Sequence, residues 1–409
     1  MKSDIDLYMN EAGINALLVQ GSAQHNPSMT YFTGMVHITK GYLLKVRGSP
    51  PVLYCNDMER EEGAKTNYET HTFSTQELLV NAEGDPNLAE ALILERILTE
   101  YDISGRVSVY GTGEAGQIFS ALNMLADRLP GVDLIGEPVS SSVLIQARGT
   151  KDDEEITRIR SMGEITTSVV GDVIAFLTSH QVRDGILIDQ NGVALTIGDV
   201  KKKINLWLTM RGAENPYGSI FAIGRDAGIP HSSGTNDDLI RLGESIVFDI
   251  YPCEAGGGYF HDFTRTWCLG YAPAEVQALY DDVLELYETI SAAIRPDKYA
   301  REYQQMTCKF FEERGHPTMG SNPRAVEGYV HSLGHSLGLN IHEAPMMRDL
   351  ATNNAKLIPG TVFTIEPGLY YPDRGMGVRI EDTVWMKPDG ELETLVDFPK
   401  DLVIKIPGV

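Results

Sequence analysis

The segment SIVFDIYPCEAGGGYFHDFTRTW, residues 245–267, decides the fold. Its first half alternates between two kinds of side chain as a β-strand does, which places Asp249 on the face opposite Phe248. The second half repeats this alternation around Asp262. The three glycines at 256–258 predict a turn that lets the two strands pair as a hairpin. We therefore expect antiparallel β structure that carries two aspartates on one side.

Both aspartates lie among β-branched and aromatic residues, where a carboxylate is costly unless its charge is compensated. Two carboxylates that face the same way would also raise each other's pKa. One interpretation makes Asp249 and Asp262 exposed acids on an edge strand. The other places them in a site that holds cations, and this interpretation requires further ligands from elsewhere in the chain.

Histidines supply the next candidates, because six of the ten fall between residues 231 and 342. They are His231, His261, His316, His331, His335 and His342. The segment HSLGHSLGLNIHE (331–343) concentrates three of them among small residues that allow close approach of the backbone. These three are either exposed imidazoles near a helix cap, or one metal ligand and two groups that face a substrate.

Two further strand-like segments contain a carboxylate in an apolar run. TVFTIEPGLYY (361–371) contains Glu366 just before a Pro-Gly pair. MGVRIEDTVWM (376–386) contains Glu381, with Arg379 two residues earlier and therefore on the same face of a strand. Each glutamate alone is a weak signal, since a Glu often ends a strand. Together with the two aspartates they predict four carboxylates on β structure in the second half of the chain.

Four buried carboxylates cannot share a site without cations, because nothing else compensates their mutual repulsion. Two divalent ions would balance the four negative charges, with the imidazole neutral. Oxygen-rich ligation with one imidazole favours Mn²⁺, Co²⁺ or Zn²⁺. Two such ions about 3.5–4 Å apart can hold a bridging hydroxide as nucleophile and polarise a carbonyl group. The candidate metal ligands are Asp249, Asp262, His335, Glu366 and Glu381.

The chain as a whole predicts two domains, 1–148 and 149–409. Strand-like and helical segments alternate in the first, which is typical of an α/β domain. In the second, period-two alternation predicts an α+β domain around an antiparallel sheet. We expect a long helix to begin at the boundary with Thr150 as its N-cap, and residues 182–196 to form a loop or hairpin between two helices. The first domain's expected strands are 16–20, 41–46, 51–54 and 106–110, and its expected helices are 3–14, 58–66, 87–103 and 114–128.

The composition excludes several classes of partner. The formal net charge is −23, so the chain lacks the basic surface with which proteins bind nucleic acids or anionic membranes. The four cysteines have no CxxC spacing, which suits a reduced compartment. The N-terminal segment has no signal-peptide pattern, and no apolar run approaches the ~18 residues of a membrane helix. We expect a cytoplasmic protein.

The order Asp, Asp, His, Glu, Glu closely resembles that of the pita-bread dinuclear metallopeptidases. The strings that carry the resemblance are FDIYP, HDFTRTW, GHSLGL, TIEPGLY and VRIEDTV. Within that superfamily the chain is most similar to Xaa-Pro dipeptidases (prolidases) and Xaa-Pro aminopeptidases, which carry an extra N-terminal α/β domain of the creatinase/prolidase type. The resemblance implies a pita-bread catalytic domain, hydrolysis of Xaa-Pro bonds in dipeptides or at peptide N-termini by a metal-bridging hydroxide, and a homodimer.

The resemblance also implies a role for each metal-binding position. Asp249 would bind one ion, Asp262 and Glu381 would bridge both ions, and His335 with Glu366 would complete the other. Glu366 would in addition move the proton between the bridging hydroxide and the leaving imide nitrogen.

Four other positions match substrate-binding and catalytic residues of the same family. His231 in GIPHSSG matches a substrate-binding histidine, and His342 matches the one that stabilises the substrate carbonyl and the tetrahedral oxyanion. Arg379 resembles the arginine that supports this centre. His331 matches a histidine that lines the proline pocket in the aminopeptidases.

Two departures from the family pattern leave questions open. Asp249 and Asp262 lie 13 positions apart, slightly more than is usual, which implies a larger turn. Prolidases have an arginine that clamps the carboxylate of the dipeptide, and Arg348 aligns with it only loosely. The alternatives are a pita-bread metalloenzyme with a non-peptide substrate (an organophosphate hydrolase or a lyase on a small acid), a metal-free hydrolase of the creatinase type, and a non-enzymatic binding module.

Overall fold

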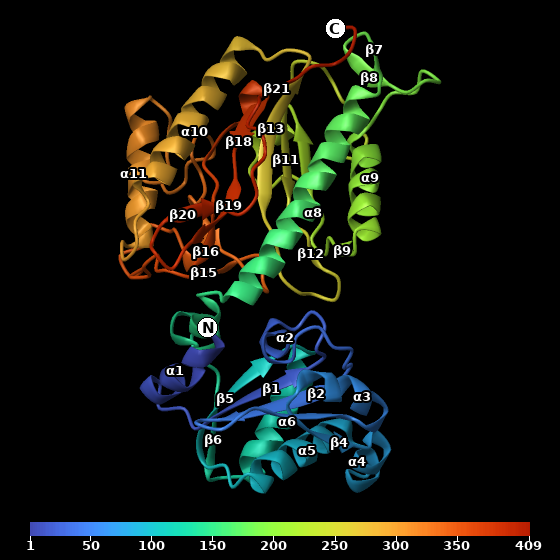
Figure 1. Cartoon of the computed structure of the whole chain (residues 1–409), viewed down its shortest axis with the longest axis vertical. Helices are drawn as coiled ribbons and strands as arrows, with labels where there is room; N and C mark the ends of the chain where they lie inside the picture. The colour runs from blue at the N-terminus through green and yellow to red at the C-terminus, as the bar shows by residue number, and fades with distance from the viewer. The chain divides into compact units, whose positions relative to one another are not determined.

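The computed structural model describes residues 1–409, with the side chain of Ser140 outside the description. The chain divides into two compact units. The first comprises Met1–Arg148 with Gly256–Gly258, and the second comprises Gly149–Ala255 with Tyr259–Val409. Figure 1 colours the first unit mainly in blue to teal and the second in green to red.

A mixed six-stranded sheet forms the centre of the first unit, in the order β4-β3-β2-β1-β5-β6. Its strands are β1 (Ala16–Gly21), β2 (Gly41–Val46), β3 (Val52–Asn56), β4 (Glu69–Phe73), β5 (Gly105–Gly111) and β6 (Val132–Ile135). β2 is antiparallel to both its neighbours, and the remaining pairs are parallel. The helices are α1 (Ile5–Glu11), α2 (Pro27–Thr33), α3 (Arg60–Gly63), α4 (Thr75–Asn81), α5 (Pro86–Glu100), α6 (Ala115–Arg128) and α7 (Val143–Arg148).

The α/β interpretation of this unit is confirmed, because alternate strand residues pack against helices. Leu18 and Tyr54 from the sheet share one buried cluster with Ile97 of α5 and Leu125 of α6. The four expected strands correspond to β1, β2, β3 and β5. The sequence pattern missed β4 and β6, whose side chains are mostly half-buried or exposed and so carry little apolar signal.

Two antiparallel sheets form the second unit. The first has the order β10-β11-β13-β21, in which only β13 and β21 are parallel, and the second has the order β15-β14-β16-β19-β20. The strands of the first are β10 (Ile220–Ile223), β11 (Ser245–Ile250), β13 (Phe263–Leu269) and β21 (Val403–Ile404). Those of the second are β14 (His335–Ser336), β15 (Glu343–Met346), β16 (Val362–Ile365), β19 (Asp382–Met386) and β20 (Leu392–Thr394). Three short pairs join β7 (Gln181–Arg183) to β8 (Ile186–Ile188), β9 (Ala213–Glu214) to β12 (Cys253–Glu254), and β17 (Gly368–Tyr371) to β18 (Met376–Arg379).

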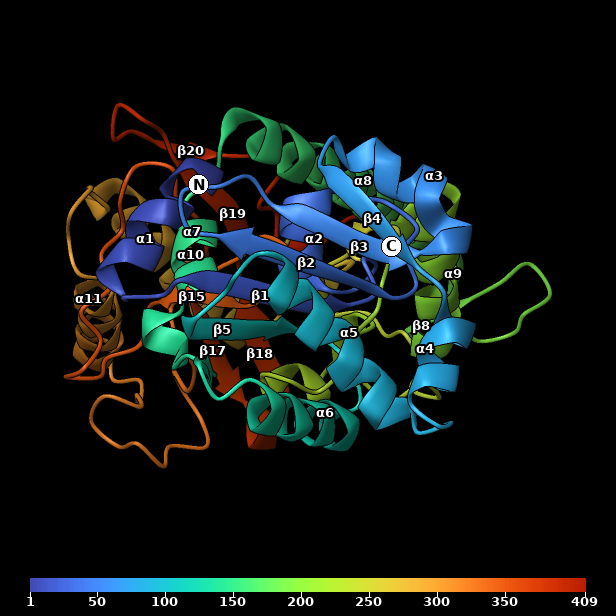
Figure 2. The ribbon, with the colours of Figure 1, turned by 90° about the horizontal axis from the view of Figure 1, so that it is seen from below.

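Helices cover each sheet from the outside, which leaves the space between the sheets for a site. Figures 1 and 2 place α8 (Asp153–Thr178) and α9 (Ile197–Met210) on one side and α10 (Ala274–Ala293) and α11 (Ala300–Glu313) on the other. The first pair of helices packs with Phe248 of β11 in one buried cluster. The second pair packs with Phe363 of β16 in another. No described helix combines the length and the apolar character that crossing a bilayer requires.

The long helix α8 begins two residues later than expected, so the assignment of Thr150 as its N-cap is wrong. Asp152 takes this position, and its side chain accepts a hydrogen bond of 3.0 Å from the amide of Glu155. The side chain of Glu155 in turn accepts a hydrogen bond of 2.9 Å from the amide of Asp152, and the two bonds form a capping box. The hairpin β7–β8 between α8 and α9 confirms the prediction for the 182–196 insert.

The segment that decides the fold pairs as expected, with one difference. β11 and β13 are antiparallel, with Asp249 opposite Thr264, and Ile246, Phe248 and Ile250 face one buried cluster. The connection between β11 and β13 is not a tight hairpin, because it contains β12, which pairs with β9. Asp262 therefore lies just before β13 rather than within it.

Candidate active site

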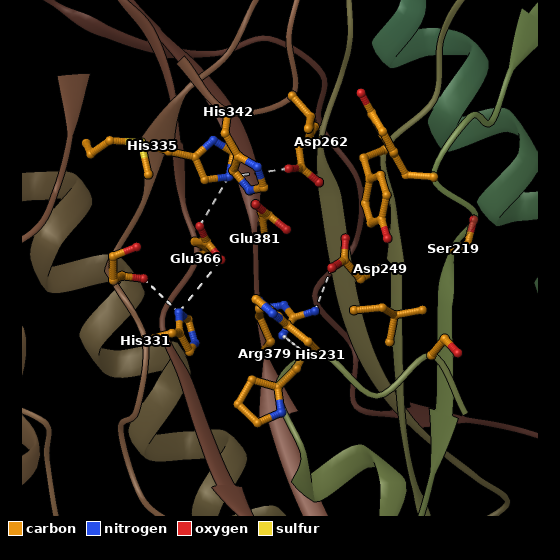
Figure 3. A pocket seen from close by; sticks show the side chains of 18 of the residues that line it. Ser219, His231, Asp249, Asp262, His331, His335, His342, Glu366, Arg379 and Glu381 are labelled. Carbon is orange, nitrogen blue, oxygen red and sulfur yellow. Dashed lines mark hydrogen bonds and ion pairs between the residues drawn. The ribbon is translucent and has the colours of Figure 1, made fainter. Parts of the chain in front are cut away.

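A cavity of about 1440 Å³ opens within the second unit. Figure 3 shows the polar side chains that converge in it from both sheets. The structure brings together all nine site residues predicted from the sequence, and also Arg348. The predicted residues that line the cavity are His231, Asp249, Asp262, His331, His335, His342, Glu366, Arg379 and Glu381.

The four carboxylates reach the cavity from the ends of four different strands. Asp249 is the penultimate residue of β11, and Asp262 immediately precedes β13. Glu366 follows β16, and Glu381 lies between β18 and β19. Asp249, Asp262 and Glu381 are buried, and the side chain of Glu366 is 14% exposed. The interpretation of the aspartates as exposed edge-strand acids is therefore wrong.

His335 is held with one ring nitrogen directed at the carboxylates. Its Nδ1 lies 3.1 Å from the carbonyl oxygen of Ser336, and because a carbonyl only accepts, Nδ1 carries the proton. The lone pair of Nε2 then faces Asp262 Oδ2 at 3.6 Å and Glu366 Oε1 at 3.4 Å. A lone pair that faces two acceptors is repelled unless a proton or a cation lies between them. This tautomer is the one that metal-ligating histidines adopt.

The carboxylate oxygens give an independent test of whether metal ions fit. Among the described residues, three buried oxygens have no hydrogen-bond partner in this site: Oδ1 of Asp249, Oδ1 of Asp262 and Oε1 of Glu381. Buried carboxylate oxygens without partners are costly, and a divalent cation is the usual compensation. One ligand atom each from Asp262, His335 and Glu381 lie within 4.8 Å of one another. The donor set therefore fits divalent metal ions.

The pKa values of the carboxyl groups and of His335 depart from their usual values in the direction that this crowding predicts. Burial raises the pKa of Asp262 and of Glu381 well above the usual range, and the neighbouring carboxylates raise both further. Burial, with a smaller contribution from the charge of Asp249, raises the pKa of Glu366 to about 8. Burial lowers the pKa of His335 to about 3, so this imidazole is neutral. Without cations the site can hold its carboxyl groups only by retaining protons.

Arg379 connects the Asp249 side of the site to the histidines. Its Nη2 donates to Asp249 Oδ2 at 2.6 Å, and its Nη1 donates to the hydroxyl of Tyr370 at 2.7 Å. Tyr370 in turn lies 3.0 Å from Nε2 of His331, whose Nδ1 donates to the carbonyl of Ser332. Tyr370 is a site residue that was not predicted from the sequence, although its place four residues after Glu366 in the same motif was a usable signal.

A threonine fixes the orientation of Glu381. The hydroxyl of Thr264 donates to Glu381 Oε2 at 2.6 Å and accepts from Nε of Arg379 at 3.2 Å. Thr264 was also missed, and its signal was the alternation of the HDFTRTW string, which places it two residues after Asp262. Such hydrogen bonds behind the ligands orient them for the ions.

The remaining histidines separate into two groups. His231 and His342 are exposed at the cavity, and the ring of His342 lies 4.3 Å from that of His335, centroid to centroid. His316 pairs instead with Asp282 at 2.9 Å, away from the cavity. His261 is fully buried against Gly163 of α8. Neither of these last two histidines lines the cavity.

Comparison with known proteins identifies the family. The profile of metallopeptidase family M24 matches residues 157–388, more than half of the chain. The chain belongs to this family. A relative named "Probable dipeptidase PepE" from Mycobacterium tuberculosis is 30% identical over 68% of this M24 chain and 66% of its own length. A protein named "Xaa-Pro dipeptidase" from Pyrococcus horikoshii is 26% identical over 94% and 93% of the two chains. The alignment with the mycobacterial relative thus spans just under two thirds of that protein.

Solved structures extend the similarity to the whole M24 chain. An X-Pro aminopeptidase from Thermotoga maritima superposes with a TM-score of 0.76 at 22% identity, covering 98% of this chain and all of the other. A prolidase from Pyrococcus furiosus superposes with a TM-score of 0.72 at 24% identity, covering 96% and 99%. These superpositions show the two-domain fold that the sequence resemblance predicted. The chain thus has the family and the fold of metallopeptidases, and its carboxylates and His335 fit divalent metal ions.

Proposed function

We propose that the protein hydrolyses Xaa-Pro peptide bonds, in dipeptides or at the N-termini of peptides, with two divalent metal ions. The observation that carries this proposal is the set of four inward-facing carboxylates around His335 with three unpartnered oxygens. Relatives named Xaa-Pro dipeptidase and a structural neighbour named X-Pro aminopeptidase support the choice of substrate.

Five residues would hold the two ions: Asp249, Asp262, His335, Glu366 and Glu381. Two ions against four carboxylates leave the ligand set neutral overall, and the mixture of oxygens and one imidazole favours Mn²⁺, Co²⁺ or Zn²⁺. When bound, such ions lower the pKa of water and polarise a carbonyl oxygen.

Glu366 is the candidate for proton transfer. Its two oxygens face His335 Nε2 at 3.4 Å and His331 Nδ1 at 3.8 Å. In the proposed reaction it takes a proton from the attacking water, whose oxygen bonds to the scissile carbonyl carbon. The same carboxyl group then gives the proton to the imide nitrogen as the C–N bond breaks. Proline leaves as a neutral secondary amine.

The other cavity residues bind and orient the peptide. His342 lies beside His335 and would donate a hydrogen bond to the carbonyl oxygen as it becomes negative. His231 lies on the opposite wall and would bind the substrate there. His331 and Arg379, linked through Tyr370, would line the side that receives proline.

The alternatives from the sequence are less well supported. The five ligand positions are all occupied by residues that bind metals, which does not suit a metal-free hydrolase or a binding module. The comparisons name peptidases and do not favour an organophosphate or small-acid substrate.

A panel of peptides tests the substrate. Protein reconstituted with Mn²⁺, Co²⁺ or Zn²⁺ is given Ala-Pro, Ala-Pro-Ala, longer Xaa-Pro peptides and Ala-Ala as a control. Cleavage of Ala-Pro alone identifies a dipeptidase, and cleavage of the longer peptides identifies an aminopeptidase. Failure to cleave any Xaa-Pro bond in protein that contains two ions would reject the proposal.

Two further properties belong to the same proposal. The cysteine pattern supports a cytoplasmic location, since scattered cysteines without paired spacing suit a reducing compartment. The family resemblance supports a homodimer, which light scattering of the metal-loaded protein tests. A mass of one chain, 45.1 kDa, would contradict the dimer.

A further inference from the structure

One arm of the cavity extends away from the carboxylates towards α9. We call it the α9 arm and define it by Lys201, Asn205, Asn215, Ser219 and Ile220, all of which line the cavity. Ile220 pairs directly with Asp249 across β10 and β11, so the arm begins beside a proposed metal ligand. Nothing in the proposed reaction uses it.

The polar groups of this arm are arranged so that hydrogen-bond donors remain free. Asn215 Nδ2 donates to Asn205 Oδ1 at 2.9 Å and to Ser219 Oγ at 3.0 Å. Because Asn205 Oδ1 and Ser219 Oγ act as acceptors here, the amide nitrogen of Asn205 and the hydroxyl hydrogen of Ser219 are available to a ligand. Asn215 Oδ1 is an acceptor without a hydrogen-bond partner, and it is buried away from solvent.

Lys201 adds a charge to these donors. It lies one helical turn before Asn205 on α9, so the two side chains share a face. The ammonium is half-buried and donates to the carbonyl of Gly234 at 3.4 Å, and it forms no ion pair with any residue that the structure describes. Burial lowers the pKa of Lys201, and the negative charge of Asp226 raises this pKa by a smaller amount. A half-buried, unpaired ammonium on a cavity wall favours an anionic ligand.

The position of the arm indicates which part of a peptide it contacts. In Figure 3 Glu366 and His331 lie on one side of the cavity, and Asp249 and Ser219 lie on the other. The proton donor must be next to the leaving nitrogen, so the proline lies on the Glu366 side. The residue before the scissile bond then lies on the side of Asp249 and Ser219, where its side chain enters the α9 arm.

We propose that the α9 arm selects an acidic side chain, Glu or Asp, before the scissile bond, through Lys201 with the donors of Asn205 and Ser219. This inference rests on the proposed Xaa-Pro hydrolysis and specifies its substrate class. An arm that offers donors and a positive charge stabilises a carboxylate, hydrogen-bonds an amide more weakly, and repels Lys or Arg at this position.

The test compares Glu-Pro with Gln-Pro, which has the same shape without the charge, and with peptides of other charge and size. kcat/KM is measured for Glu-Pro, Gln-Pro, Lys-Pro and Ala-Pro, and for the same peptides extended by alanine, with the metal-loaded protein. We expect Glu-Pro to exceed Gln-Pro by about tenfold, since charge-assisted hydrogen bonds are roughly twice as strong as neutral ones. Lys201→Met should reduce the Glu-Pro to Gln-Pro ratio to near one.

Two further variants make the result specific. Lys203→Met removes an exposed lysine of α9 that does not line the cavity, and it should retain the wild-type ratio. Lys201→Glu should reverse the preference so that Lys-Pro exceeds Glu-Pro, which loss of folding would not produce. Equal rates for Glu-Pro and Gln-Pro in the wild type, with Ala-Pro cleaved, would overturn the inference alone. Failure to cleave any of these peptides would instead reject the proposed function, and the inference with it.

Discussion

Among the individual residues of the site, Glu366 lies between two imidazoles. Its oxygens face His335 and His331, and the hydroxyl of Thr364 donates to Oε1 at 3.4 Å. The motif TIEPGLY predicted that Glu366 belongs to the site only in combination with the other four strings of the family pattern. Its distance from His331 could not be predicted, because the two residues lie 35 positions apart in sequence. Their segments come together through the pairing of β14 with β16 and the hydrogen bond from the amide of Glu366 to the carbonyl of Leu333.

Replacing Glu366 by Gln removes the proton acceptor and keeps the shape of the side chain. We expect kcat to fall by about 10²–10⁴, the usual contribution of general acid–base catalysis, with the fold unchanged by circular dichroism. Glu288→Gln makes the same chemical change on the exposed surface of α10 and should leave kcat unaltered. A Glu366→Gln protein with near-normal turnover would reject the role in proton transfer.

At the scale of secondary-structure elements, a buried ion pair joins the strands that present the ligands. Arg265 of β13 contacts Asp382 of β19 at 2.7 Å, with both side chains 1% exposed. Arg265 also donates to the carbonyls of Phe398 and Pro399, and Tyr287 of α10 donates to Asp382 at 2.6 Å. The pair therefore fixes the start of β19, immediately after Glu381, against β13, immediately after Asp262.

Replacing Asp382 by Asn leaves the guanidinium of Arg265 buried without a counter-charge. We expect the free energy of unfolding of the catalytic domain to fall by about 3–5 kcal/mol, and the metal content to fall with it. Glu95→Gln breaks the half-exposed pair with Arg128 and should cost less than about 1 kcal/mol. Urea unfolding measures both, and equal effects of the two variants would contradict the structural role of the buried pair.

Local sequence pattern predicted most of these elements but not their connections. Alternation of apolar residues identified β11 and β13, because one face of each is buried in a continuous core. It did not show that Glu366 and Glu381 lie just beyond strands, since β16 pairs with β19 while β17 and β18 pair with each other. Pairing between distant strands depends on tertiary contacts that no short window of sequence contains.

At the scale of the whole molecule, four of the 57 acidic residues have a different role from the rest. Most of the charge of −23 keeps an acidic surface solvated, whereas these four converge in one cavity. Their number and order were predictable because each interrupts an apolar strand pattern. The exclusion of His261 and His316 from the cavity was not, because adjacency in sequence to a ligand or a strand does not fix the direction of a side chain.

The stability of the whole protein should depend on pH in a way that metal ions remove. Glu366 has its pKa raised from 4.5 to about 8 in the folded, metal-free state, so folding retains a proton that the unfolded chain releases above pH 4.5. This contribution is therefore complete below pH 4.5 and is lost as the pH rises through about 8. Melting temperatures of metal-free protein should fall between pH 6 and pH 8, and less steeply in Glu366→Gln.

Bound divalent ions should reverse this dependence, because they stabilise the ionised carboxylates of the folded state. The same melting experiment with Mn²⁺ in place of chelator should therefore show a higher melting temperature at pH 8 than the metal-free protein. A metal-free protein that is equally stable at both pH values, with no gain from Mn²⁺, would contradict the proposed carboxylate cluster.

We propose that these four carboxylates and His335 form a two-metal centre that cleaves Xaa-Pro bonds. The most direct test is the cleavage of Ala-Pro and of Ala-Pro-Ala by metal-free protein titrated with Mn²⁺, with the bound metal measured in the same samples. We predict that the rate rises with bound metal and reaches its plateau at two ions per chain. Protein that binds two ions per chain and cleaves neither peptide would contradict this proposal.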